Sequence, residues 1–334
     1  MVIRMPCTVA LVDSGIDPDL YGDRVTEWLD FAKEGEKASA CDSSGHGTLC
    51  ASALLSANPD TELVVVRALD AGNRCSSDTV VLALERLAES DADIVSLSLC
   101  TDHREHEGRY RKAIDRLNRR GKLVLAAGSN RGQLSLPAEL PRVVGVAGNR
   151  FRDPEEYWYQ SAAGLQCVAD HKPVLLPGLG GRYELFGGNS KACALFAGIL
   201  SRHWEELDGA AWKEREAVMQ SYAKRVGWKP EDIVPQEPHL PPAAWRGEDA
   251  EIFAKLKRIV CAYLGIPRED AETLRSKPLY EFGITRRGAA DFLRAVEDGL
   301  GIGIDYSQVS FYWFYSVELL YSYIAQKGVG AQDG

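Results

Sequence analysis

Two polar side chains in the first fifty residues occupy positions where an enzyme could hold a carboxylate and a base. Asp13 ends an apolar run, residues 9–12, that predicts a buried parallel strand. Its carboxylate is therefore expected at the carboxyl edge of a sheet, where α/β proteins build their sites. His46 lies between two glycines, ahead of residues 49–54, which suit a helix. The glycines permit a tight turn, so we expect the imidazole to face outward.

Two further candidates come later in the chain. Ser190 follows two glycines and an asparagine and precedes an apolar helical segment, residues 192–200. Its hydroxyl is expected at a helix N-terminus, where unpaired N–H groups and the helix dipole favour a developing negative charge. Asn130 lies in a turn, residues 126–132, directly after a predicted strand. That turn could bring an amide side chain beside the same oxygen.

These four residue types are the ones that acyl transfer uses, because it needs a nucleophile, a base, an orienting carboxylate and oxyanion donors. Each residue alone has a simpler interpretation. An Asp after a strand is most often a turn residue, and a Ser after glycines is usually a helix cap. The order Asp, His, Ser, with each residue at a sheet edge or helix start and an Asn-bearing turn before the last, favours a site over coincidence.

The elements that must position these residues alternate along the first two thirds of the chain. Strands are predicted at residues 8–12, 63–67, 94–99, 123–127 and 143–147. Crossover helices are predicted at 47–55, 78–89 and 109–120, a further helix from about Ser190 to beyond His203, and another over 212–226. This alternation indicates an α/β fold with a parallel sheet and helices on both faces.

The residues around these positions resemble motifs of the subtilase, or subtilisin-like serine protease, family. Residues 9–17, VALVDSGID, are similar to the family's aspartate motif, residues 45–48, GHGT, to its histidine motif, and residues 188–190, GNS, to its serine motif. The Asp, His, Ser order is also that of subtilisin. The resemblance covers about residues 6–228, so the protease domain is expected over 1–230.

The resemblance implies roles for individual residues. Ser190 would be the nucleophile, His46 the general base and later acid, Asp13 the orienting carboxylate and Asn130 the oxyanion donor. The backbone of Ser98, Leu99 and Cys100 would bind the substrate as an extra strand. The implied activity is that of a serine endopeptidase that acts on a peptide or protein. Because the cysteines indicate a cytoplasmic protein and a carrier-like domain is expected to follow, we expect the substrate to be a precursor, such as one from which a leader is removed. No cofactor and no metal is expected.

Several positions depart from the family's pattern. Lys191 follows the serine where the family usually has Met, and Asn189 replaces the usual Thr. Ser129 makes the oxyanion turn one residue longer, so Asn130 either reaches the site or does not. Cys100 stands where a Gly commonly floors the specificity cleft, which would narrow it. Two alternatives to a hydrolase therefore stay open: an acyl-enzyme transferase, in which an amine gives cyclisation or ligation, and an inactive pseudoprotease scaffold.

The last third of the chain predicts a separate domain. Four prolines fall within eight residues of a predicted linker, 231–248, and helical stripes of apolar residues follow in an expected domain over 249–328. Its four-helix spacing resembles an acyl or peptidyl carrier domain. That family's phosphopantetheine serine is missing, because Thr285 and Arg286 stand at the matching positions. The resemblance implies a degenerate carrier that recognises a partner protein. We expect most of its aromatic cluster at 311–323 to be the core of this domain or its contact with the protease domain, and not a docking face.

Composition narrows the remaining possibilities. The chain has 334 residues, of which 45% are hydrophobic, enough for a sizeable core. Its 39 basic against 48 acidic residues give a net charge of -9, without a basic tract, so nucleic acid is not an expected partner. The eight cysteines are scattered without metal-ligand spacing, as reduced cytoplasmic thiols would be. No secretion signal and no membrane span is expected.

Overall fold

The computed structural model describes residues 6–32, 41–132, 135–233, 250–267, 274 and 277–326, and it divides into two compact units. The first comprises Met1–Lys172, Pro177–Gly181 and Gly187–Pro235, and the second Pro173–Leu176, Arg182–Phe186 and Gln236–Gly334. The hairpin ahead of Ser190 thus falls largely in the second unit. Sequence reasoning had placed it in the protease domain.

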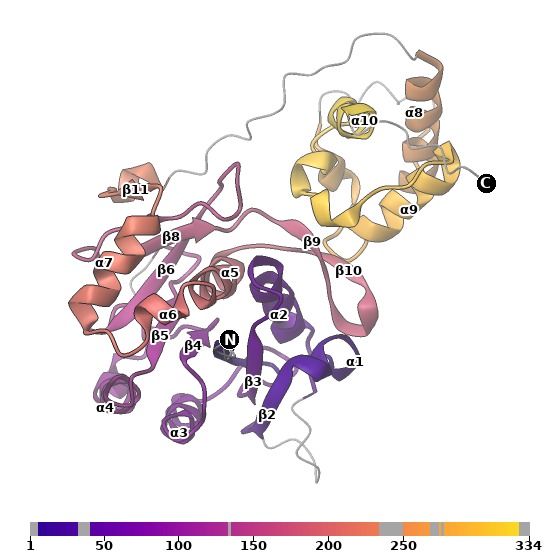
Figure 1. The fold of residues 1–334 in the computed structure, drawn as a ribbon. Coiled ribbons are helices and arrows are strands. Elements are labelled where there is room, and N and C mark those ends of the chain that lie inside the picture. Colours follow the sequence, from indigo (N-terminus) through magenta and orange to yellow (C-terminus); the bar gives the residue numbers. More distant parts are fainter. Residues whose placement is uncertain are drawn as a thin grey trace, which may run out of the picture. The chain divides into compact units, whose positions relative to one another are not determined.

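The first unit is built on a sheet whose strands run in the order β11-β7-β8-β6-β5-β4-β1-β3-β2 in the described part of the chain (Figure 1). All its pairings are parallel except β7 with β8. The strands are β1 Thr8–Asp13, β2 Val25–Asp30, β3 Glu62–Arg67, β4 Ile94–Leu97, β5 Leu123–Ala127, β6 Val143–Asn149, β7 Trp158–Tyr159, β8 Cys167–Asp170 and β11 Arg225–Val226. The predicted parallel α/β sheet is confirmed.

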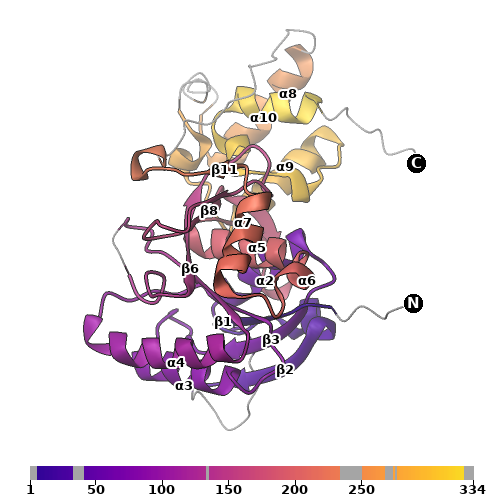
Figure 2. The same ribbon diagram turned by 60° about the vertical axis from the view of Figure 1, so that its left-hand side comes forward.

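Helices cover both faces of this sheet, as Figures 1 and 2 show. They are α1 Pro18–Tyr21, α2 His46–Ala57, α3 Ser77–Leu87, α4 Glu107–Arg119, α5 Asn189–Ser201, α6 Trp204–Leu207 and α7 Trp212–Tyr222. Alternate strand residues such as Val12 and Val66 share a core with α3 and α4. On the other face α2 and α5 pack together, so closely that a Cβ on Gly198 would lie 2.2 Å from Leu54 O. The two helices that begin at His46 and Asn189 are therefore neighbours.

Two predicted helices end earlier than their sequence pattern indicates. The helix that begins at Asn189 stops at Ser201, and α6 follows as a separate turn. The helix predicted over 212–226 ends at Tyr222, because Arg225 and Val226 pair with β7 instead. The predicted proline-rich linker lies, from residue 234 on, outside the described residues. The second of these differences arises at β11, the edge strand at the end of the sheet opposite β2.

The second unit combines helices with a hairpin. Its helices are α8 Ala250–Leu264, α9 Ala289–Leu300 and α10 Val317–Gln326, and its strands are β9 Val174–Pro177 and β10 Tyr183–Phe186. Leu175 and Leu185 lie in one core with side chains of all three helices. The elements that the structure describes between residues 250 and 326 are helices, but the hairpin from residues 174–186 adds two strands to this unit, so the expected all-helical domain is not confirmed. Trp313, Phe314 and Tyr321 are buried there, as expected of core aromatics.

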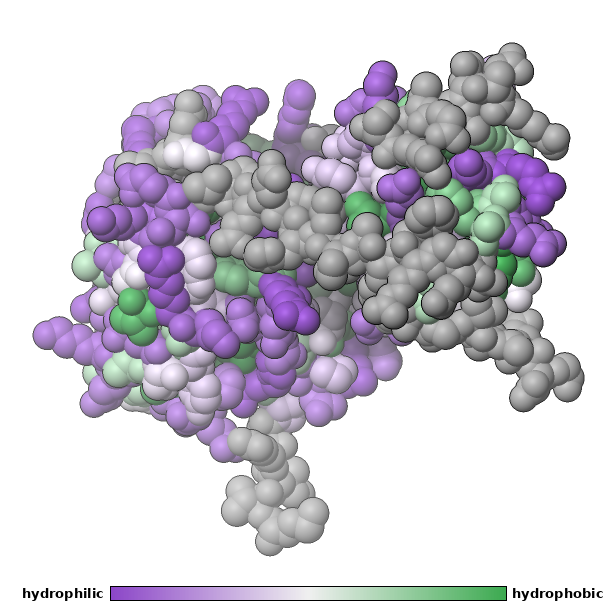
Figure 3. Space-filling model, turned by 90° about the horizontal axis from the view of Figure 1, so that it is seen from above, coloured by the Kyte–Doolittle hydropathy of each residue, from purple (hydrophilic) through white to green (hydrophobic). Residues whose placement is uncertain are grey.

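Where Figure 3 is coloured by hydropathy, hydrophilic side chains surround small groups of hydrophobic ones. Exposed large hydrophobic residues are spread over several elements: Leu82, Leu179, Tyr222, Val226, Tyr263 and Tyr280. Single exposed apolar residues of this kind are normal. Among the described helices, none has both the length and the apolar character needed to cross a membrane.

Candidate active site

Asp13 and His46 form a hydrogen-bonded pair at the carboxyl end of β1. The buried strand ends at Asp13, and α2 begins at His46, whose Nδ1 lies 2.7 Å from Asp13 Oδ1. The Asp13 side chain is 1% exposed and that of His46 is 23% exposed. Burial disfavours the imidazolium, but the Asp13 carboxylate outweighs it and raises the pKa of His46 above its ordinary value. The pair is thus arranged to orient the ring and to stabilise its protonated form.

A polar network fixes the turn that carries His46. Asp42 Oδ1 accepts from Ser14 Oγ at 2.8 Å and from Gly45 N at 2.8 Å, while its Oδ2 accepts from Thr48 N at 2.8 Å. Ser14 N donates to Asp13 Oδ1 at 2.8 Å, and Ser14 Oγ accepts from the amide of Gly47 at 2.9 Å. The carboxylate and the imidazole are therefore held by one connected set of hydrogen bonds.

Ser190 is the second residue of α5 and is half-buried. Its Oγ donates to Ser98 O at 3.4 Å, and Ser98 Oγ donates to Ser190 O at 3.3 Å. Ser98 and His46 line the same cleft. Since the first amides of a helix have no intrahelical acceptor, the N–H of Ser190 is a suitable oxyanion donor. The fold thus brings the serine to the edge that also carries Asp13 and His46.

Asn130 reaches the serine motif despite the longer turn. Its Oδ1 accepts from Asn189 N at 2.9 Å, which directs the oxygen to α5 and leaves Nδ2 as the donor. Asn189, which stands in place of the usual Thr, is buried and donates through Nδ2 to Gly128 O at 2.9 Å. Gly188 has φ +90, and a Cβ there would lie 3.2 Å from Asn130 Oδ1. These contacts tie the end of β5 to the start of α5.

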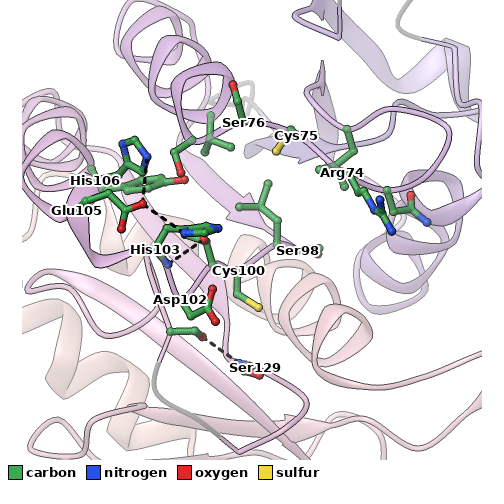
Figure 4. A pocket seen from close by; sticks show the side chains of 18 of the residues that line it. Arg74, Cys75, Ser76, Ser98, Cys100, Asp102, His103, Glu105, His106 and Ser129 are labelled. Atoms are coloured by element: carbon green, nitrogen blue, oxygen red, sulfur yellow. Dashed lines mark hydrogen bonds and ion pairs between the residues drawn. The ribbon is translucent and has the colours of Figure 1, made fainter.

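A cleft of about 790 Å³ borders His46. Figure 4 shows Ser98, Cys100, Asp102 and Ser129 around it, together with the His103, Glu105 and His106 side chains. The ladder between β4 and β5 ends at Leu97, and the next bridge along the chain is made by Thr101. Residues 98–100 between them lie in the cleft wall, and Cys100 is exposed. An extended peptide could pair with this segment.

The comparisons with known proteins agree with this geometry. The model of the Subtilase family matches residues 6–236. The chain belongs to the subtilase family. Subtilases are serine peptidases, and the relatives of this subtilase include known serine proteases.

These relatives are distant in sequence. The "Thermophilic serine proteinase" of Bacillus sp. (strain AK1) is 26% identical over 208 residues, which cover 58% of this subtilase and 51% of the relative. The "Intracellular serine protease" of Paenibacillus polymyxa is 25% identical over 239 residues, 65% of this chain and 72% of the relative. The match thus spans about half the length of the first relative and almost three quarters of the length of the second.

Solved structures share the fold. "Sphericase" superposes with a TM-score of 0.55 at 20% identity, covering 66% of this subtilase and 86% of that chain. A structure described as a "Lanthipeptide Protease" superposes with a TM-score of 0.56 at 19% identity, covering 69% and 83%. At such identities the likeness establishes the subtilisin-like fold of the first unit.

Cys50 lies beside the Asp13–His46 pair, and sequence reasoning missed it. Its Sγ is 3.8 Å from His46 Nδ1, and burial raises the thiol's pKa to about 11. Among the described residues, Asp13, His46 and Cys50 are the group whose potential ligand atoms lie within 4.8 Å of one another. A metal fits poorly there, because the 2.7 Å between Nδ1 and Oδ1 is a hydrogen-bond separation and the thiol is protonated at neutral pH. The spacing of four residues on one helix face was the available signal.

Proposed function

We propose that this subtilase is an endopeptidase in which Ser190, His46 and Asp13 form the catalytic triad. The observation that carries the proposal is the 2.7 Å contact between His46 Nδ1 and buried Asp13, beside a cleft whose wall residue Ser98 bonds to Ser190. An ordinary surface histidine has no need of a buried carboxylate partner. The pair also leaves Nε2 of the ring as the nitrogen able to take a proton from a nucleophile.

The reaction we propose gives each of these residues one role. Ser190 Oγ attacks the peptide carbonyl while His46 takes its proton, and Asp13 stabilises the imidazolium that forms. Asn130 Nδ2 and the Ser190 amide donate to the developing oxyanion. His46 then protonates the leaving amine. Water, activated by the same histidine, hydrolyses the acyl-enzyme and frees the serine.

The substrate we propose is a peptide or protein that binds as an extended strand along Ser98, Leu99 and Cys100. Removal of a leader from a precursor peptide inside the cell is the specific use we propose. Two likenesses suggest it: a relative named as an intracellular protease and a fold neighbour named as a lanthipeptide protease. All eight cysteines are free, which fits a reducing compartment.

For the second unit we propose a carrier-shaped recognition module that binds a partner protein and carries no prosthetic group. The loop where a carrier would bear its phosphopantetheine instead contacts the hairpin. Leu185 N donates to Arg286 O at 3.1 Å, and Arg287 Nε lies 3.3 Å from Glu184 Oε2. A loop engaged by β10 in this way supports recognition over covalent loading.

Proteolysis of denatured casein in water enriched in ¹⁸O tests the proposed activity. A hydrolase places one ¹⁸O at each new C-terminus, because water resolves the acyl-enzyme. A transferase joins the acyl group to an amine and leaves products without the heavy isotope. Ser190→Ala is the matched control and should release no fragments. Labelled fragments from the wild type alone support the proposal, while unlabelled ligated products or equal cleavage by Ser190→Ala would refute it.

A further inference from the structure

Lys191, directly after Ser190, forms a buried ion pair with the end of β8. Its Nζ lies 2.7 Å from Asp170 Oδ2 and 3.3 Å from Asp170 O. The two side chains are 3% and 0% exposed. Asp170 Oδ1 accepts from Phe151 N at 3.0 Å, so both carboxylate oxygens have partners. The unusual lysine of the serine motif thus points into the protein and not into the cleft.

Stability alone does not account for such a pair. Removing two charges from water costs about as much as their attraction returns, and well-packed apolar residues of similar volume are often equally or more stabilising. Burial lowers the pKa of Lys191, and only the nearby Asp170 opposes that effect. The ion pair differs in geometry from the methionine that the family usually has at this position. Its hydrogen bonds fix where the ammonium lies relative to the carboxylate, whereas an apolar side chain has no such directional contact.

A fixed geometry is useful at Lys191 because the backbone leaves the first unit and returns to it just before Ser190. After β8 the chain enters the second unit, where residues 173–176 and 182–186 contribute to its core, and it returns at Gly187. Gly188 N donates to His171 O at 2.9 Å. Together with the Lys191–Asp170 pair, this bond fastens the returning segment to the end of β8, on both sides of Ser190.

We propose that Lys191 and Asp170 are positioning residues that hold the first turn of α5 so that Ser190 meets His46 and the oxyanion donors in reactive geometry. The proposal rests on the catalytic role proposed for Ser190. A shift of the first turn would displace both Ser190 Oγ and the Ser190 amide. Displacements of about 1 Å can cost about a hundredfold in rate. The pair therefore acts on the chemical step, through the serine, and not on substrate binding.

Three variants and one matched control separate positioning from mere stability. Lys191→Met removes the ammonium, Asp170→Asn removes the charge but keeps an acceptor for Phe151 N, and the double variant removes both charges. The double variant leaves no unpaired buried charge, so it folds even if Lys191→Met does not. The control is Lys122→Met: Lys122 is also buried and donates to Ser90 O and Ala92 O, both at 2.6 Å, at the start of β5.

The measurement is labelling of the full chain by a fluorophosphonate over a range of concentrations, at a temperature well below the Tm of every variant. It yields kinact, which reports the chemical step, and KI, which reports binding. We expect kinact of Lys191→Met and of the double variant to fall about tenfold or more, with KI within about twofold. Lys122→Met lowers Tm but keeps kinact within about twofold.

Each result is decisive. A double variant that folds and keeps the kinact of the wild type overturns the positioning role and leaves the pair as part of the core. Equal losses of kinact in Lys122→Met and Lys191→Met would likewise show a general effect of lost stability. If the wild type itself is not labelled, the proposed function is refuted. This outcome differs from the first two, which both require a wild type that is labelled.

Discussion

Asp13→Asn isolates the electrostatic part of the His46 environment. The substitution keeps the shape of a side chain that is 1% exposed, and it retains an oxygen for Ser14 N, but it removes the charge beside His46 Nδ1. At 2.7 Å and an effective dielectric constant of about 20, the attraction between imidazolium and carboxylate is about 6 kcal/mol. Loss of the orienting carboxylate from a serine-protease triad costs about 10⁴ in rate, or about 5.5 kcal/mol. An attraction of this size is therefore large enough to account for a loss of that order.

The same substitution also changes how the labelling rate depends on pH, in a direction that can be predicted. Asp13 raises the pKa of His46, so the base is freed only as pH rises through that elevated value, and the labelling rate rises with it. In Asp13→Asn the raising charge is gone. The acid limb of the rate profile therefore moves to lower pH while the plateau falls about 10⁴-fold.

The assay is the second-order rate of fluorophosphonate labelling between acid and alkaline pH. Asp93→Asn is the matched control, because Asp93 is a half-buried carboxylate that accepts from Thr8 N at 3.0 Å, just before β4 and far from the carboxyl edge. It should keep the wild-type profile. A loss of less than about tenfold in Asp13→Asn, or an acid limb that does not move, would refute the role assigned to the pair.

Three further predictions concern other parts of the molecule. Asn130→Ala lowers kinact by about 10² to 10³ with little change in Tm, and a loss below about threefold contradicts the proposed role of Asn130 as oxyanion donor. Gly47→Ala places a Cβ 2.0 Å from a backbone oxygen and lowers the free energy of unfolding by about 3 kcal/mol in urea titrations, whereas Gly108→Ala meets nothing within 4 Å and changes it by about 1 kcal/mol or less. Leu185→Ala, at a core position that is 9% exposed, lowers the free energy of unfolding by about 2 to 4 kcal/mol. The same change at Leu82, which is 50% exposed, lowers it far less, and equal losses would contradict the placement of β10 in the second unit's core.

Much of the first unit could be predicted because its signals are local. Asp13 ends an apolar run and His46 lies between glycines, so strand, turn and helix place both residues at one sheet edge before any tertiary contact is known. Ser190 follows from the same logic at the start of α5. The position of Cys50 could also be predicted, since it lies four residues after His46 on the same helix, but the sequence analysis treats it only as one of eight scattered reduced thiols.

The features that escaped prediction depend on contacts between distant residues. Lys191 is unusual for its position in the motif, but its partner Asp170 is 21 residues away, at the end of strand β8, and the sequence does not show that the two meet. The hairpin of β9 and β10 lies within the range predicted for the protease domain, and only its packing against the helices of the second unit shows that it belongs to that unit. The end of α7 was overestimated for a similar reason, because pairing of Arg225 and Val226 with β7 overrides the helical pattern.

The most direct test of the central claim is intact-protein mass spectrometry after exposure to a fluorophosphonate, with peptide mapping of the modified residue. The account predicts one adduct on the wild type, located on Ser190, and none on Ser190→Ala or His46→Ala. His46→Ala must retain its fold, which circular dichroism checks. An absence of adduct on folded wild type, or an adduct on a different serine, would contradict the proposed triad.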